Sequence, residues 1–164
     1  MRTGRLTDVL RPNTNAPMVY RLHASLGYRL SLAARLQERR LEDGLRALGL
    51  TRITWCVLLA VGNEGLDRPT DIAAFVGIDR TATSRALRQM EAAGLIERAS
   101  GEDDRRTTTV TLTAKGRKWL ADGTPFAVAN NHTMMAKLSD DETAELIRLL
   151  DKVVEGEAMD LKTF

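Results

Sequence analysis

One short stretch of the chain, residues 80–93, combines hydroxyl and guanidinium side chains at helical spacing. If it forms a helix, its apolar face consists of the residues at i, i+3, i+4 and i+7, namely Thr83, Ala86, Leu87 and Met90. The opposite face then carries Thr81, Ser84, Arg85 and Arg88, with Gln89 at its edge. Such side chains bind phosphates and base edges, and an arginine can bind guanine O6 and N7 together. The stretch therefore indicates either a DNA-binding face or an ordinary solvated helix face.

A second group of candidate residues lies in the charged segment 101–106, GEDDRR. Asp104 and Arg106 are two residues apart, so their side chains point the same way in an extended hairpin. The carboxylate could hold the guanidinium in one rotamer, with Arg105 beside it. An arginine fixed at a hairpin tip suits a narrow minor groove, whose negative potential attracts it. The alternative is a charged turn that keeps the hairpin soluble.

The segments around these residues predict two short helices followed by two strands. Residues 69–77 predict a short helix that ends at Gly77, and the next helix begins after Asp79, a good N-cap, and ends before Gly94. Two short helices with a glycine in the turn between them match a helix-turn-helix. Segments 95–100 and 107–113 follow and are typical of strands. A hairpin directly after a helix-turn-helix is the layout of a winged helix.

Long helical patterns flank this region, so we expect a mainly α fold with a small β-wing. Leucines recur at spacings of three and four from residue 19 to 48, and two further helices are expected within 114–158, the second after the capping box SDDE at 139–142. We interpret residues 1–18 as an N-terminal arm, 19–48 and 114–158 as a helical dimerisation region, and 50–113 as a winged helix-turn-helix DNA-binding domain.

Composition excludes several classes of protein. The net charge of the 164 residues is only +2, but residues 80–118 carry nine Lys and Arg against five acids, whereas 139–164 carry three against eight. Such segregated charge can steer a polyanion towards one part of the surface. We found no motif of a common enzyme class, no ligand spacing for a metal, and no apolar run that could span a membrane. We expect no cofactor and no enzymatic activity, and a protein of the cytoplasm.

The chain resembles the MarR family of bacterial regulators over about residues 25–155. The matching motifs are GLT at 49–51, the helix-turn-helix, GLIER at 94–98, DDRR at 103–106, LTAKG at 112–116 and LSDDE at 138–142. The resemblance implies a homodimer that binds pseudo-palindromic double-stranded DNA, usually as a repressor, and releases it when a small molecule binds. It also implies that Arg106, supported by Asp104, is the wing arginine, and that Ser84 and Arg85 lie on the recognition helix.

The resemblance further implies an effector pocket between the dimerisation helices and the DNA-binding part. Arginine and histidine among aromatic side chains would suit an aromatic carboxylate, and the candidates are Arg21, His23, Tyr28 and Trp55. Tyr28 and Trp55 are equally typical of core residues. Two other hypotheses remain open: redox sensing through the single cysteine, Cys56, and a winged helix used for protein–protein contact.

Overall fold

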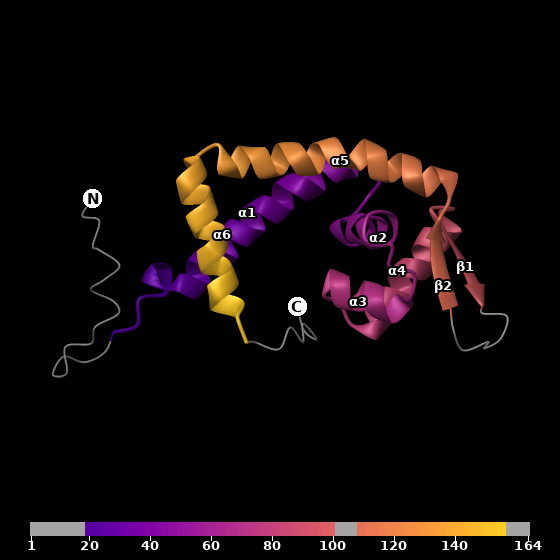
Figure 1. Cartoon of the computed structure of the whole chain (residues 1–164), viewed down its shortest axis with the longest axis horizontal. Coiled ribbons are helices and arrows are strands. Elements are labelled where there is room, and N and C mark those ends of the chain that lie inside the picture. The colour runs from indigo at the N-terminus through magenta and orange to yellow at the C-terminus, as the bar shows by residue number, and fades with distance from the viewer. Residues whose placement is uncertain (1–18, 101–107, 157–164) are drawn as a thin grey trace. The chain divides into compact units, whose positions relative to one another are not determined.

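The computed structural model describes residues 19–100 and 108–156. Within these residues the chain forms six α-helices and one two-stranded antiparallel sheet (Figure 1). The predicted fold class, mainly α with a small β-hairpin, is confirmed. The predicted N-terminal arm, residues 1–18, lies outside the described residues. The chain divides into two compact units, residues 1–39 and 40–164.

The first unit contains a 3-10 helix (Leu22–Ala24) and the start of α1 (Leu26–Arg46). The single helix predicted from residue 19 is wrong at this point, because Ser25 interrupts it. The backbone of Ser25 is extended, with φ −72° and ψ 146°. Its hydroxyl donates to the carbonyl of Leu22 (2.7 Å) and accepts from the amide of Tyr28 (3.3 Å). A serine that bonds its neighbours in this way competes with a continuous helix and starts a new one.

In the second unit, α2 (Arg52–Gly62) is the central helix, with α5 on one side and α3 on the other (Figure 1). Its N-cap is Thr51, whose hydroxyl accepts from the amide of Thr54 (3.2 Å), while the Thr54 hydroxyl accepts from the amide of Thr51 (2.8 Å). This reciprocal pair satisfies backbone donors that the first turn leaves without partners. The largest fully buried side chains of the core are Leu45, Val57, Leu58, Ile72, Leu87, Met90, Ile96 and Val110.

Helices α3 (Pro69–Val76) and α4 (Arg80–Ala92) form the predicted helix-turn-helix. Gly77 follows α3 in the left-handed conformation, at φ 71°. The Asp79 carboxylate accepts from the amide of Ala82 (2.7 Å), which confirms the predicted N-cap of α4. Gly94, at φ 69°, lies just beyond the end of α4 as predicted. A left-handed residue at this place is strained for any side chain, which is why glycine occurs there.

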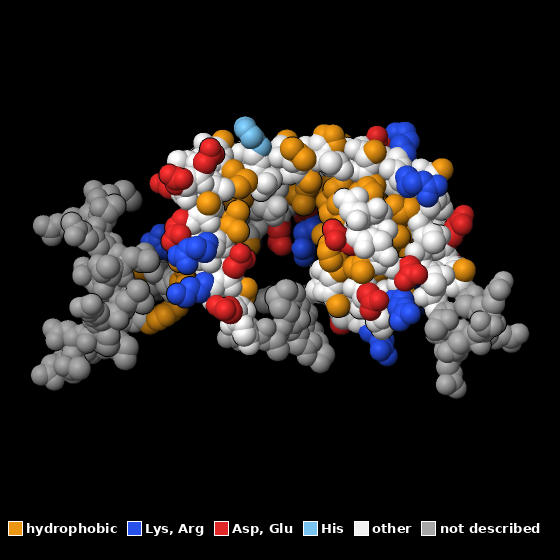
Figure 2. Space-filling model, viewed as in Figure 1, with side chains coloured by type: hydrophobic (Ala, Val, Ile, Leu, Met, Phe, Trp, Pro, Cys, Tyr) orange, Lys and Arg blue, Asp and Glu red, His pale blue; other side chains and the backbone are white. Residues whose placement is uncertain are grey.

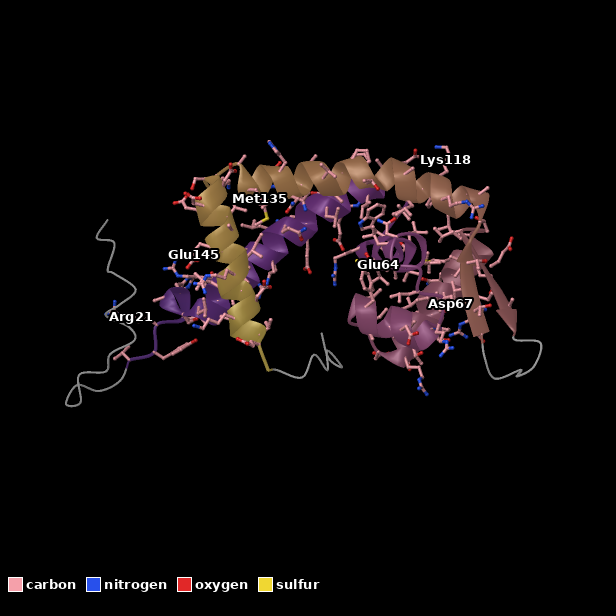
Figure 3. All side chains as sticks on the ribbon, viewed as in Figure 1. Arg21, Glu64, Asp67, Lys118, Met135 and Glu145 are labelled. Atoms are coloured by element: carbon pink, nitrogen blue, oxygen red, sulfur yellow. The ribbon has the colours of Figure 1, made fainter. Side chains whose placement is uncertain are left out.

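The hairpin consists of β1 (Ile96–Ser100) and β2 (Thr108–Leu112), with Arg98 opposite Val110. Val110 and Leu112 are buried and Thr111 is exposed, as the alternating pattern predicts. The amide of Val110 also donates to the carbonyl of Asp67 (2.8 Å), so the loop before α3 is attached to β2 (Figure 3). The hairpin is thus held to the loop that leads into the helix-turn-helix.

Two helices complete the second unit, α5 (Ala114–Met135) and α6 (Asp140–Val154). The Thr113 hydroxyl accepts from the amide of Gly116 (3.0 Å) and donates to the carbonyl of Gly94 (2.7 Å), which joins the start of α5 to the end of α4. Ser139 and Glu142 form the predicted capping box of α6. None of the side chains of α6 is buried, although the helix is strongly amphipathic (Figure 2).

Candidate nucleic-acid interface

The two faces of α4 divide as the sequence predicts. On the core side, the packed residues are Thr83, Ala86, Leu87 and Met90. On the other side, the exposed residues are Thr81, Ser84, Arg85, Arg88 and Gln89. Because the buried face anchors the helix, the exposed side chains extend from a rigid support. Their role in DNA binding stays a prediction.

The side chains of Arg88 and Thr83 both donate hydrogen bonds to backbone carbonyls, but Arg88 is exposed and Thr83 is buried. The Nε of Arg88 donates to the carbonyl of Ser84 (3.3 Å), so its guanidinium lies back along the helix. Thr83 is only 2% exposed, and its hydroxyl donates to the carbonyl of Asp79 (2.8 Å). Thr83 is therefore a core residue that satisfies its own hydrogen bond. The exposed face of α4 offers Arg85 and the hydroxyls of Thr81 and Ser84 to a ligand.

A groove of about 420 Å³ opens between α3, α4 and the hairpin. Its lining is more apolar than polar, and its polar residues come from four different elements, α3, α4, β1 and β2. The lining residues are Pro69, Thr70, Ala73, Arg80, Thr83, Ser84, Leu87, Arg98 and Thr108. The groove brings Ser84, a predicted site residue, together with Arg80 and Arg98, which the sequence analysis did not single out. Figure 2 shows Lys and Arg side chains on the part of the surface formed by α3 and α4.

Arg98 of β1 is held by Glu91 of α4. Its Nε donates to Oε2 of Glu91 (2.9 Å), and its Nη2 donates to the same oxygen. The hydrogen bond from Arg98 lowers the pKa of the Glu91 carboxyl below its ordinary value, and the same contact raises the pKa of Arg98. Both groups are therefore charged at neutral pH. The motif GLIER contains Arg98, but nothing in the sequence indicates that Glu91 would be its partner.

The charged hairpin tip, with Asp104, Arg105 and Arg106, lies outside the described residues. The described strands fix where the tip begins and ends, since Ser100 pairs with Thr108 in the register of the sheet. The hypothesis of a wing arginine supported by an aspartate is untested.

The predicted effector residues fall into both units. In the first unit, the rings of His23 and Tyr28 are in contact, with centroids 4.5 Å apart, and Arg21 and His23 are exposed. In the second unit, Trp55 is 2% exposed and belongs to the hydrophobic core. The indole of Trp55 therefore packs as a core side chain.

The described residues contain neither a candidate membrane span nor a candidate metal site. In the part of the chain that the structure describes, no helix combines the length and the apolar character needed to cross a bilayer. Among the same residues, no three His, Cys, Asp or Glu side chains come together in a way that could hold a metal ion. Cys56 is half-buried in α2 and packs against the core.

Comparison with known proteins agrees with this architecture. Residues 48–107, which contain the helix-turn-helix and the first strand, match the model of the MarR family. A probable transcriptional regulator from Pseudomonas aeruginosa is 27% identical, with a TM-score of 0.73, and the match covers 81% of this chain and 99% of that one. A MarR variant from E. coli, complexed with operator DNA, is 25% identical with a TM-score of 0.73, covering 79% and 93%.

A third similar structure is that of BpsR from Bordetella bronchiseptica, whose DNA binding is regulated by 6-hydroxynicotinic acid. It is 24% identical with a TM-score of 0.73, and the match covers 79% of this chain and 98% of that one. The family match lies on the helix-turn-helix, and the shared fold extends over about four fifths of the chain. The family match and these similar structures together support a winged helix regulator of the MarR family.

Proposed function

We propose that the protein is a homodimeric repressor that binds a pseudo-palindromic duplex operator and releases it when a small aromatic carboxylate binds. The observation that carries the proposal is the exposed face of α4, with Thr81, Ser84, Arg85, Arg88 and Gln89 on a helix whose other face is buried. A helix held in this way can enter the major groove as a unit. The E. coli relative complexed with operator DNA supports DNA as the ligand.

The hairpin supplies the second DNA contact. We assign minor-groove binding to Arg106, with Asp104 orienting it and Arg105 beside it at the tip. A side chain inserted into a narrow minor groove responds to groove shape more than to base identity. The α4 face would therefore give most of the sequence specificity, and the wing would give affinity and register.

The dimer accounts for the apolar surface of α6. Six large hydrophobic side chains on this helix are between 39% and 52% exposed, namely Leu146, Ile147, Leu149, Leu150, Val153 and Val154. A contiguous apolar face on a 15-residue helix is typical of a protein–protein interface. We assign residues 19–48 and 114–158 to dimerisation and 50–113 to DNA binding. Two copies would place two α4 helices on half-sites about one helical turn apart.

The effector site is assigned to aromatic and charged side chains of the first unit. The neighbouring rings of His23 and Tyr28, with the exposed guanidinium of Arg21 nearby in sequence, could bind an aromatic acid. The regulation of BpsR by 6-hydroxynicotinic acid supports this class of ligand. We leave Trp55 out of the proposed pocket because its ring is buried in the core.

A salt titration tests DNA binding without knowledge of the operator. The purified protein is titrated into fluorescent random-sequence duplex DNA at several salt concentrations, and anisotropy is recorded. Phosphate neutralisation predicts that log affinity falls linearly with log salt, with a slope of about −0.9 for each phosphate contacted. A flat response, or no binding at low salt, would contradict DNA as the partner.

A further inference from the structure

An acidic residue beside a DNA-binding face should weaken binding, because it repels phosphate. Glu91 is such a residue, since it lies on α4 only a few residues after Arg85 and Arg88. Its Oε2, however, accepts from both Nε and Nη2 of Arg98, which lines the groove between α3, α4 and the hairpin. Glu91 therefore has a specific structural partner at the place where its charge would otherwise be unfavourable.

The groove has the composition of an anion site. Arg80 and Arg98 line it together with the hydroxyl-bearing residues Thr70, Ser84 and Thr108. Arginine and hydroxyl donors are the side chains that most often contact DNA phosphates. The described lining residues contain no carboxylate, and although Glu91 pairs with Arg98 from beside the groove, Arg80 adds a second positive charge.

The position of the groove agrees with a DNA backbone contact. Arg80 lies in the first turn of α4, and Ser84 belongs to its exposed face, so one side of the groove continues the predicted DNA-binding surface. Thr108, at the start of β2 next to the hairpin tip, lines the groove from the hairpin. A duplex in contact with both α4 and the hairpin would carry its phosphates past this groove.

The contact with Glu91 determines how Arg98 can bind. A guanidinium has five N–H donors in a planar fork, and Glu91 accepts from one on Nε and one on Nη2, which leaves the two donors of Nη1 and the second donor of Nη2 for a ligand. Because a long arginine side chain loses rotamer freedom when it binds, fixing it beforehand lowers the cost of each new hydrogen bond. The ion pair therefore orients the guanidinium before DNA arrives.

We propose that the groove binds a backbone phosphate of DNA through Arg98, and that Glu91 is a positioning residue that increases DNA affinity despite its negative charge. This inference rests on the proposed function, since it specifies one contact within it. The proposal predicts that removing the Glu91 carboxylate weakens DNA binding. Simple electrostatics predicts the opposite, because loss of an acid reduces repulsion of phosphate.

The test measures the affinity of full-length variants for one duplex that the wild-type protein binds. Arg98→Ala should weaken binding about tenfold, as expected for one lost hydrogen bond to a charged group, and should reduce the salt slope by about 0.9. Glu91→Ala should also weaken binding several-fold. Arg98→Lys keeps the charge but loses the planar fork, so it should bind more weakly than the wild type.

Glu97→Ala is the matched control, because Glu97 is an exposed acid next to Arg98 on β1. It removes the same charge and should leave affinity unchanged or raise it. In the Arg98→Ala background, Glu91→Ala should cause no further loss, because the carboxylate acts through the guanidinium. Thermal unfolding checks that each variant is folded, and Glu91→Gln, which keeps an acceptor oxygen, should bind better than Glu91→Ala.

A DNA affinity that rises or stays constant in Glu91→Ala would overturn the positioning role of Glu91. The same conclusion would follow if Glu91→Ala reduced affinity equally in the wild-type and the Arg98→Ala backgrounds. Wild-type binding by Arg98→Lys would overturn the need for orientation. In each of these cases the wild-type protein still binds DNA and the proposed function stands. Absence of DNA binding by the wild-type protein at low salt would instead refute both proposals.

Discussion

Gly123 of α5 lies directly against the indole ring of Trp55 in α2. A Cβ atom at position 123 would stand 2.8 Å from Cε3 of Trp55, closer than side-chain atoms can approach. Both residues are buried, so neither can move into solvent. The absence of a side chain at Gly123 thus allows α5 to pack on α2, the central helix of the second unit.

This contact predicts that Gly123→Ala destabilises the protein. Alanine favours helix over glycine by about 1 kcal/mol, but overpacking a core contact typically costs roughly 1–3 kcal/mol. We expect a net loss of unfolding free energy in denaturant titrations followed by circular dichroism. Gly27→Ala, in α1, is the control, because a Cβ there meets no atom within 4 Å. A Gly123→Ala protein as stable as the wild type would show that α5 is not packed as described.

Arg85→Ala tests base recognition by α4. If Arg85 binds a guanine, its loss should cost about 1–3 kcal/mol on the operator and much less on random duplex DNA. Lys118→Ala removes the same charge from α5, where Lys118 pairs with Asp122, and should have little effect on either DNA. Equal losses on both duplexes for Arg85→Ala would identify a phosphate contact instead.

Arg106→Ala tests the hairpin tip. Because a minor-groove arginine responds to groove shape, affinity should fall for most sequences, and most strongly where A-tracts narrow the groove. Asp104→Ala should show a smaller loss of the same kind if the carboxylate orients the arginine. Anisotropy titrations on duplexes with A/T-rich and G/C-rich flanks measure this difference. Unchanged affinities for Arg106→Ala on both duplexes would remove the wing from the account.

Leu150→Glu tests the dimer. A charge in the middle of the apolar face of α6 should shift the protein towards monomer, because burying an unpaired carboxylate is costly. Sedimentation velocity over a range of concentrations measures the shift. Arg148→Ala, on the same helix, breaks only the exposed pair with Glu145 and should leave the dimer intact. A dimer unaffected by Leu150→Glu would place the interface elsewhere.

Local signals in the sequence predict the helix-turn-helix well. Asp79 and Gly94 mark the two ends of α4, and the apolar spacing identifies its buried face, because caps and periodicity act within a few residues. Ser25 shows the limit of periodicity, since the leucine pattern continues across the residue at which the backbone leaves the helix. The spacing of apolar residues does not reveal the hydrogen bonds of the Ser25 hydroxyl, which accompany the break in the helix.

The groove around Arg98 could not be predicted in the same way. Its residues come from α3, α4 and both strands, and only the folded chain brings them together. Glu91 and Arg98 are seven residues apart but lie on different elements, helix α4 and strand β1, so no spacing within one element predicts that they pair. Trp55 shows the opposite case: its type suggests a ligand pocket, but its position opposite Gly123 makes it a core residue.

Selection of random duplex DNA by the purified protein, followed by sequencing, tests the central claim most directly. A dimer that presents two α4 helices predicts enrichment of a pseudo-palindrome whose half-sites are about one helical turn apart. The enriched sequence would then serve as the operator for the variants above and for screening aromatic acids. If no sequence is enriched at low salt, the protein is not the sequence-specific dimeric DNA-binding protein proposed here.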